Sequence, residues 1–83
     1  MNKKIILGVQ VTDRLKKVAQ VQKILTQHGC NIKTRLGLHE TGNAGCSPSG
    51  LLILETVGKP AEITALEKKL KRVPGLAVRK MVF

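Results

Sequence analysis

The feature that most constrains the fold is an unbroken apolar run near the middle of the chain. Residues 50–57 read GLLILETV, and the four residues from Leu51 to Leu54 are all large aliphatics. A strand that is apolar on both faces is typical of a central strand with neighbours on either side. In a chain of 83 residues, we therefore expect one sheet built around this segment and one domain, spanning residues 1–83.

The segments on either side of this run predict the other elements. Alternating aliphatic residues predict strands over residues 3–11, 31–38 and 76–82. Apolar residues at helical spacing predict helices over residues 14–28 and from Pro60 onward. Gly29 stands where a left-handed helix end is expected. The Gly, Ser, Asn and Pro content of residues 40–49 predicts an irregular loop.

The order of these elements predicts the topology. A βαββαβ chain with right-handed crossovers forms a ferredoxin-like α+β fold, with a four-stranded antiparallel sheet in the spatial order 4-1-3-2 and two helices on one face. The other face is then uncovered, although its central strands are apolar, and such a patch typically marks an interaction site. We expect it to pack against another copy of the chain, as a dimer or tetramer, through Ile6, Gly8, Leu52 and Leu54.

Composition sets limits on partners and compartment. Lys and Arg number 15 against five acids, and the net charge of +10 favours anionic partners. The basic start and the short apolar run from Ile5 to Val11 predict a strand instead of a secretion signal. No segment reaches the roughly 18 apolar residues that span a bilayer, so no membrane partner is expected. Two cysteines without a secretion signal favour free thiols in the cytoplasm.

The predicted loop before the central run is the first candidate ligand site. Loops of this length in small domains are often functional. Its backbone amides and hydroxyls, with a basic and an imidazole side chain close by in sequence, could bind an anion. The residues of this candidate site are Arg35, His39, Gly42, Asn43, Gly45, Ser47 and Ser49. The alternative is a mobile connector, and the sequence identifies neither a ligand nor a cofactor.

A metal site is a weaker hypothesis. His39 and Cys46 lie at the same end of the predicted sheet, and two copies could pool two of each as ligands. His28 and Cys30 precede the strand that His39 follows, which separates the two groups by roughly 26–30 Å. The same distance argues against a disulfide between Cys30 and Cys46.

Catalysis has little support in the sequence. The five acids show no paired arrangement typical of an acid–base site. Glu62 and Glu67 fall on the second predicted helix, where we expect them to face solvent. Glu55 lies in the central strand, and a partner such as Arg35 or Lys80 would explain its position. We therefore expect that the protein is not an enzyme.

Nucleic-acid binding is the alternative function class. The same fold binds RNA through aromatic side chains on its two central strands. Those strands carry none here, since the chain has no Trp or Tyr and a single Phe at position 83. Phosphate contacts by basic clusters remain open, through Lys33, Arg35, Arg79 and Lys80 or through Lys68, Lys69, Lys71 and Arg72. A third alternative is a module that only oligomerises or docks onto another protein.

Several stretches resemble a known family. Residues 15–32, LKKVAQVQKILTQHGCNI, resemble the first helix and second strand of ACT and ACT-like domains, and residues 72–83 resemble their closing helix and strand. Residues 24–38, 46–58 and 63–78 resemble the small stand-alone ACT-like proteins named as iron-only hydrogenase system regulators, which are related to the ligand-binding half of nickel-responsive repressors. The resemblance implies an oligomeric regulatory or sensor module and no reaction.

The chain departs from this family pattern in its first connection. ACT domains that bind amino acids often carry Pro-Gly after an Asp-Arg pair there, whereas Asp13-Arg14 is followed here by Leu15-Lys16. The resemblance therefore does not extend to an amino-acid site. It also brings no DNA-binding segment, so we expect that any role in transcription would require a partner chain.

Overall fold

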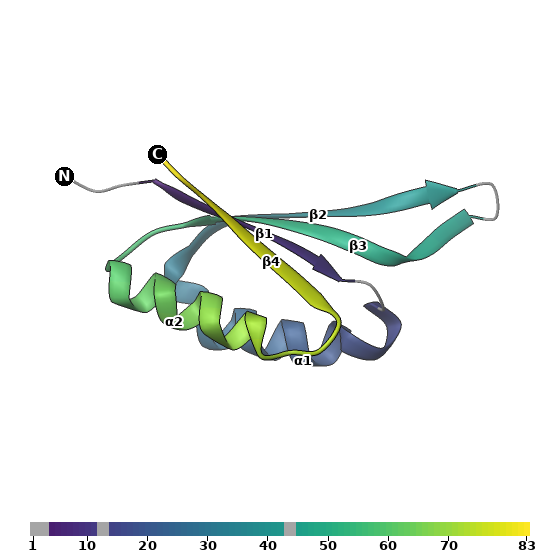
Figure 1. The fold of residues 1–83 in the computed structure, drawn as a ribbon, viewed down its shortest axis with the longest axis horizontal. Helices are drawn as coiled ribbons and strands as arrows, with labels where there is room; N and C mark the ends of the chain where they lie inside the picture. Colours follow the sequence, from purple (N-terminus) through teal and green to yellow (C-terminus); the bar gives the residue numbers. More distant parts are fainter. Residues whose placement is uncertain (1–3, 12–13, 43–44) are drawn as a thin grey trace.

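The elements follow the predicted βαββαβ order (Figure 1). The computed structural model describes residues 4–11, 14–42 and 45–83, and it describes side chains for residues 4–11, 19–37 and 50–83. The first half consists of β1 (Ile5–Val11), α1 (Arg14–Gln27), the 3-10 turn η1 (Gly29–Asn31) and β2 (Ile32–Gly42). The second half consists of β3 (Gly45–Thr56), α2 (Pro60–Lys71) and β4 (Leu76–Val82).

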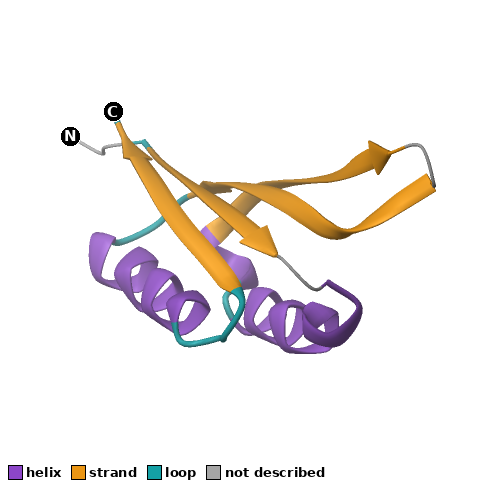
Figure 2. Ribbon diagram, turned by 45° about the vertical axis from the view of Figure 1, so that its right-hand side comes forward, coloured by secondary structure: helices purple, strands orange, loops and turns teal. Residues whose placement is uncertain are grey.

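The sheet has the predicted topology. Its strand order is β2-β3-β1-β4, which is 4-1-3-2 read from the opposite edge, and every neighbouring pair is antiparallel. Figure 2 shows both helices on one face of the sheet and none on the other. The layers therefore leave one broad surface of the sheet uncovered within a single copy.

The core lies between the sheet and the helices. It is built from aliphatic side chains that each element turns toward the other layer: Leu7, Val9, Val11, Val21, Leu25, Leu54, Leu66, Leu70 and Val78. Burial of a side chain of this size contributes roughly 1.5–3 kcal/mol to stability. With a core this small, few such contacts can be lost before the fold fails.

The register with β1 decides which residues of β3 face the helices. Leu54 pairs with Leu7, and residues directly opposite in an antiparallel pair share a face. Leu54 is 0% exposed in the core, and Leu52 packs against that core. The prediction that Leu52 and Leu54 face the uncovered side is therefore wrong. Leu51 and Ile53 face it, since four consecutive aliphatic residues offer no alternation from which the sequence alone could choose.

Residues 40–42 and 45–49, which lie in the predicted irregular loop, belong instead to the paired strands of a long hairpin. The β2–β3 ladder continues to the pairs Thr41–Cys46 and Gly42–Gly45, so the two strands lengthen to 11 and 12 residues. Glycine and serine favour loops, but they do not prevent backbone pairing between two strands. The pairing energy of the backbone thus overrides the composition of this segment.

An irregularity interrupts this hairpin near Pro48. The pairs His39–Gly50 and Thr41–Cys46 leave three residues of β3 opposite one of β2. Proline has no N–H to donate, and within sheets it is therefore found at edges or bulges. Pairing with β1 ends at Gly50, so beyond it the hairpin is two-stranded and projects from the body (Figure 1). The principal extents of 46 × 22 × 17 Å reflect this projection.

The 3-10 turn η1 replaces the left-handed helix end predicted at Gly29. Among the described residues, positive φ angles occur only at Gly58 and Gly75, and α1 ends at Gln27. Asn31 closes the turn through its backbone, because its N–H donates to the carbonyl of His28 at 2.9 Å. The chain thus leaves α1 through a 3-10 turn, without a left-handed residue.

Asn31 also ties the start of β2 to the start of α2. Its Nδ2 donates to the carbonyl of Val57 and to Glu62 Oε1, each at 3.1 Å, and Val57 N–H donates back to the Asn31 carbonyl at 2.9 Å. Glu62 Oε1 also accepts from the backbone N–H of Lys59 at 3.0 Å. These hydrogen bonds, the Lys59 N–H first and Asn31 second, lower the pKa of Glu62. Gly58 packs closely under this junction.

We predict that Gly58→Ala destabilises the fold by about 2 kcal/mol, since a non-glycine residue at positive φ costs roughly 1–3 kcal/mol. Gly58 has φ +106°, and an added Cβ would lie 2.6 Å from Asn31 Nδ2. Urea unfolding followed by circular dichroism measures the loss. Gly29→Ala is the matched control, because a Cβ there meets nothing within 4 Å. Equal stability of the two variants would contradict the prediction.

Candidate functional site

The uncovered side of the sheet, called here the open face, is the candidate site. Its rows follow from the register, since Ile6 lies between Glu55 and Met81, and Gly8 lies between Ile53 and Arg79. The residues of the open face are Thr34 and Leu36 of β2, Leu51, Ile53 and Glu55 of β3, Ile6, Gly8 and Gln10 of β1, and Ala77, Arg79 and Met81 of β4. Two of the four predicted interface residues, Ile6 and Gly8, are among them.

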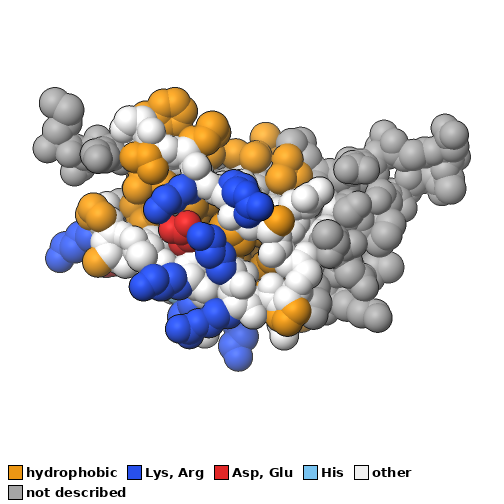
Figure 3. All heavy atoms as spheres, viewed as in Figure 1, with side chains coloured by type: hydrophobic (Ala, Val, Ile, Leu, Met, Phe, Trp, Pro, Cys, Tyr) orange, Lys and Arg blue, Asp and Glu red, His pale blue; other side chains and the backbone are white. Residues whose placement is uncertain are grey.

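Large apolar side chains are exposed on the open face. Leu36 is 52% exposed, Leu51 38% and Met81 55%. Phe83 is 73% exposed, and its backbone N–H donates to the carbonyl of Lys4 at 2.9 Å, which extends the β1–β4 ladder by one residue. Figure 3 shows hydrophobic side chains gathered along the sheet side of the molecule. Side chains of this size and number on one face are typical of an interaction surface.

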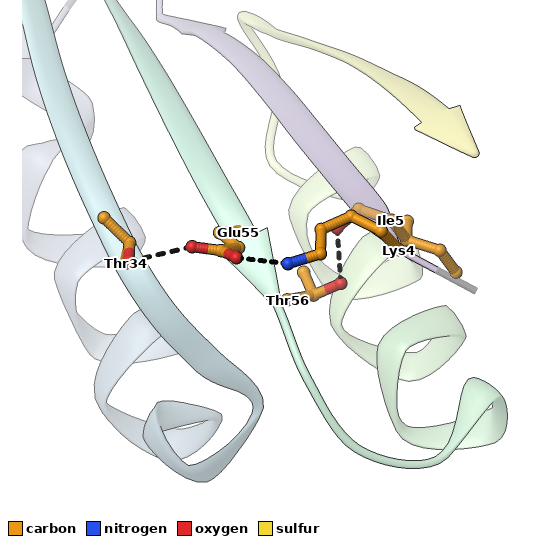
Figure 4. Close-up of polar contacts among 5 residues, drawn as sticks. All are labelled: Lys4, Ile5, Thr34, Glu55 and Thr56. Atoms are coloured by element: carbon orange, nitrogen blue, oxygen red, sulfur yellow. Dashed lines mark hydrogen bonds and ion pairs between the residues drawn. The ribbon is translucent and has the colours of Figure 1, made fainter. Parts of the chain in front are cut away.

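A polar trio crosses three strands of the open face (Figure 4). Thr34 Oγ1 of β2 donates to Glu55 Oε1 of β3 at 3.0 Å, and Lys4 Nζ, just before β1, pairs with Glu55 Oε2 at 2.6 Å. The hydrogen bond from Lys4 is the largest cause of a lowered pKa of Glu55, and the one from Thr34 follows. The predicted partners of this carboxylate, Arg35 and Lys80, are therefore wrong. Lys4 and Thr34 neutralise and orient it instead.

Thr56 secures the same part of the sheet from its other face. It is buried, and its Oγ1 donates to the carbonyl of Ile5 at 2.7 Å (Figure 4). A buried hydroxyl needs such a partner, since an unsatisfied one costs roughly 1–3 kcal/mol. The bond joins β3 to β1 next to Glu55 and so fixes the strands that carry the polar trio.

Gly8 makes a notch in the middle of the open face. A Cβ placed on it would meet one atom, the backbone oxygen of Arg79 at 3.9 Å, which is ordinary van der Waals contact. Its φ is not positive, so the strand conformation here does not require glycine. Ile53 stands beside it in the same row. The open face therefore pairs a raised aliphatic side chain with an adjacent gap.

A second surface, on α2 and β4, is strongly basic. Figure 3 shows Lys and Arg side chains gathered around an acidic side chain over these elements. Glu67 is 7% exposed, so the prediction that it faces solvent is wrong. Its carboxylate holds Lys71 at 3.1 Å and Lys80 at 3.4 Å, which joins the helix to the edge strand. Burial raises the pKa of Glu67, but hydrogen bonds and charge from the two lysines outweigh it, and the pKa is lowered.

The residues of the predicted ligand site do not gather at one point. Arg35 is exposed and pairs with Leu54 in the body of the sheet, and Gly42 lies seven residues farther along β2, roughly 23 Å away. Gly42 pairs with Gly45, and His39 with Gly50. Ser47 and Ser49 lie in the irregular segment of β3. Asn43 and the side chains of residues 38–42 and 45–49 lie outside those described, and ligand contact by these residues stays a prediction.

The proposed metal ligands His39 and Cys46 lie on neighbouring, paired segments of the β2–β3 hairpin. Cys46 pairs with Thr41, two residues from His39, and both of these side chains lie outside those described. Within the described part of the chain, no group of three or more His, Cys, Asp or Glu residues could hold a metal. Cys30 is an exposed free thiol in η1.

His28 follows the end of α1. Its Nε2 is buried without a hydrogen-bond partner among the described residues. Burial first, and the charge of Lys69 second, lower its pKa.

The sequence contained one signal for the correct face that the prediction did not use. A carboxylate belongs on the side of a strand that water or a cation can reach. Glu55 therefore indicates which face of β3 is open, and strand alternation then places Ile53 and Leu51 there with it. Arg79 was assigned to possible phosphate contacts, and only the pairing with Gly8 shows that it stands on the open face.

The chain matches no protein-family model and no curated protein. Solved structures share its fold. An uncharacterised protein from Thermotoga maritima aligns with a TM-score of 0.81 and 25% identity, covering 99% of each chain. The ACT domain of a GTP pyrophosphokinase from Chlorobium tepidum has a TM-score of 0.66 and 18% identity, covering 94% of this chain and 96% of its own.

A nitrogen regulatory PII-like protein from Thiomonas intermedia, bound to ADP, AMP and bicarbonate, aligns more distantly. It has a TM-score of 0.60 and 11% identity, and the match covers 99% of this chain and 93% of that one. The fold is therefore ACT-like, as the sequence resemblance implied. These matches do not confirm the hydrogenase-regulator family. In residues 4–11, 14–42 and 45–83, no helix is long and apolar enough to cross a membrane.

We predict that Glu67→Gln removes a pH-dependent part of the stability, on the order of 1 kcal/mol at pH 7 because both lysines are half exposed. A carboxylate with a lowered folded pKa stabilises fully above its unfolded value, about 4.3, and loses this contribution as the pH falls through the folded pKa. Urea unfolding of both proteins from pH 7 to pH 3 measures the difference. It should shrink toward acid pH, and a constant difference would contradict the assignment.

Proposed function

We propose that the chain acts as one domain, residues 1–83, and serves as a non-enzymatic regulatory or sensor module that self-associates and binds a small ligand at the subunit interface. The observation that carries this proposal is the open face, an apolar sheet surface that no element of the same copy covers. The fold is ACT-like, but its open face leaves apolar side chains exposed to water that a partner could bury.

Self-association would bury the apolar side chains that the open face exposes to water. Exposed apolar area gains about 25 cal/mol per Å² on burial. A chain this short also has a thin core, for which oligomerisation is a common source of additional stability. The exposed side chains on the open face, Leu36, Leu51 and Met81, would be buried in such an interface.

A small anionic molecule is the ligand class that the charge supports. The chain carries +10, and its basic side chains exceed the acidic ones threefold, 15 against five. One structural neighbour, the PII-like protein, is bound to ADP, AMP and bicarbonate, all anions. The outer part of the β2–β3 hairpin, with His39, remains a candidate contact region for such a ligand, and Arg35, in the body of the sheet, would have to act apart from it.

The absence of enzyme activity is proposed because the described carboxylates serve the fold. Glu55 holds two strands together, Glu62 caps α2, and Glu67 joins α2 to β4. A general acid or base must be free to exchange a proton with substrate. Carboxylates with lowered pKa values and several partners are poorly suited to that task.

Nucleic acid remains the less favoured alternative. The basic surface of α2 and β4 would bind phosphates, but the two central strands lack aromatic side chains for stacking. The open face is also mostly apolar, which does not suit a polyanion. A module that only oligomerises, without a ligand, is the other alternative.

We predict that native mass spectrometry of the freshly purified protein, without added ligand, gives a dimer or tetramer with additional bound mass. The mass excess identifies the ligand class in the same spectrum. An oligomer without extra mass would replace the sensor by a pure oligomerisation module. A bare monomer at micromolar concentration would overturn the proposal and favour nucleic acid or a foreign protein as the partner.

A further inference from the structure

We infer that the open face is occupied by a second copy of this chain in one specific two-fold arrangement, in which the Ile53 side chain of each copy enters the notch at Gly8 of the other and Glu55 pairs with the partner's Arg79. This inference rests on the self-association proposed above and deepens it, because it names the contacts that define the interface.

Charge favours a second copy over other occupants. The chain carries +10 overall, yet among the described side chains the open face bears one cation besides the polar trio, Arg79, and the trio itself pairs Lys4 with Glu55. A surface that is nearly neutral within a basic protein lets two like-charged molecules approach, whereas an anionic partner would be drawn to α2 and β4. The occupant is therefore apolar at its centre, and a second open face meets that requirement.

The shape of the open face is self-complementary. Ile53 is a raised side chain directly beside the gap at Gly8, in one row of the sheet. A two-fold axis that runs between the sheets turns each raised side chain toward the gap of the other copy. Two-fold interfaces are isologous, so one contact of this kind is made twice.

The positions of Glu55 and Arg79 decide how the two-fold axis is oriented relative to the strands. An axis parallel to the strands, between β3 and β1, would place Glu55 over the partner's Ile6 and would place Arg79 over the partner's Leu36. Both charges would then lose water against apolar side chains, which is costly for an ion without a new partner. Aligned packing is therefore disfavoured by the positions of these two residues.

A tilted axis satisfies both requirements. In a regular sheet, strands lie about 4.8 Å apart and same-face residues about 6.8 Å apart along a strand. With these spacings, a two-fold axis that crosses β1 midway between Ile6 and Gly8 places Glu55 over the partner's Arg79. The same axis brings Ile53 to within about 3 Å, in projection, of the partner's Gly8. The strands of the two copies then cross at roughly 70°, near the orthogonal class of sheet packing.

The groups that would meet are available for it. Each oxygen of Glu55 accepts one hydrogen bond, from Thr34 or from Lys4, and a carboxylate can accept about four in total. Arg79 is exposed and donates one bond, to the carbonyl of Val78 at 3.0 Å. Its guanidinium has five donors, so a second partner can be added without breaking that bond.

The first test fills the notch. Gly8→Val is compared with wild type and with the control Gly37→Val, which lies in the same sheet on the opposite face, where a Cβ meets Leu52 Cδ2 at 3.5 Å. Sedimentation equilibrium gives the dissociation constant of self-association, and circular dichroism melting verifies the fold. We expect Gly8→Val to weaken self-association at least tenfold and Gly37→Val to leave it within twofold.

Two outcomes overturn the inference in distinguishable ways. If wild type self-associates and Gly8→Val does so equally well, the notch is not in the interface, although the self-associating module proposed above stands. If wild type is monomeric, both the arrangement and the proposed self-association fail.

The second test exchanges the charges. In the proposed arrangement, Glu55→Arg places two arginines together, and Arg79→Glu places two glutamates together, so each variant alone should dissociate. A one-to-one mixture forms heterodimers in which both pairs are complementary again. We expect the mixture to recover at least a tenfold tighter association than either variant alone. A mixture that associates no more tightly than its components would exclude the Glu55–Arg79 contact. If Glu55→Arg unfolds, Arg79→Glu alone still tests the contact, because Arg79 is exposed and this variant should dissociate.

Discussion

The structure depends on one constraint: two helices can cover only one face of a four-stranded sheet. The helix-side residues of β1, Leu7 and Val9, are fully buried because both helices close over them. Every position one residue away in the same strand is thereby left on the other side, and Ile6 and Gly8 are such positions. The apolar open face is therefore a direct consequence of the core. The aliphatic residues on the open side of the central strands are therefore not required by the helix layer.

The order of elements, the topology and the position of the helices could be predicted from the sequence, because apolar periodicity and Gly or Pro at element ends are local signals. The facing of β3 could not be read in the same way. Four consecutive aliphatic residues satisfy either face, and pairing with β1 decides between them. Glu55 offered a usable clue, since a carboxylate that needs a cation cannot point into the aliphatic core. The partner it found, Lys4, is 51 residues away in sequence and is brought near by topology alone.

The candidate site was predictable in kind and not in detail. Uncovered apolar sheet was expected, and it is present with Ile6 and Gly8 in it. The Gly, Ser, Asn and Pro content of the other expected site, residues 40–49, predicts a loop. In the structure, residues 40–42 and 45–49 belong to the two strands of a hairpin, and Pro48 lies at the irregularity, since a regular ladder would exclude a proline. Composition thus indicated where the ladder is disturbed, and pairing determined that it continues.

The remaining question is why a protein of charge +10 would associate with itself. Repulsion between two copies is screened beyond about 8 Å at physiological ionic strength. The charges that matter are therefore the ones close to the contact. The helix α2, which carries Lys68, Lys69 and Lys71, lies on the face of the sheet opposite the open face (Figure 2), whereas Lys4 is neutralised locally by Glu55. What remains at the contact is Arg79, and a two-fold partner presents Glu55 to it. In the proposed dimer, the distribution of charge, more than its total, would determine which surface meets its own copy and would leave the basic surface of α2 and β4 available to anions.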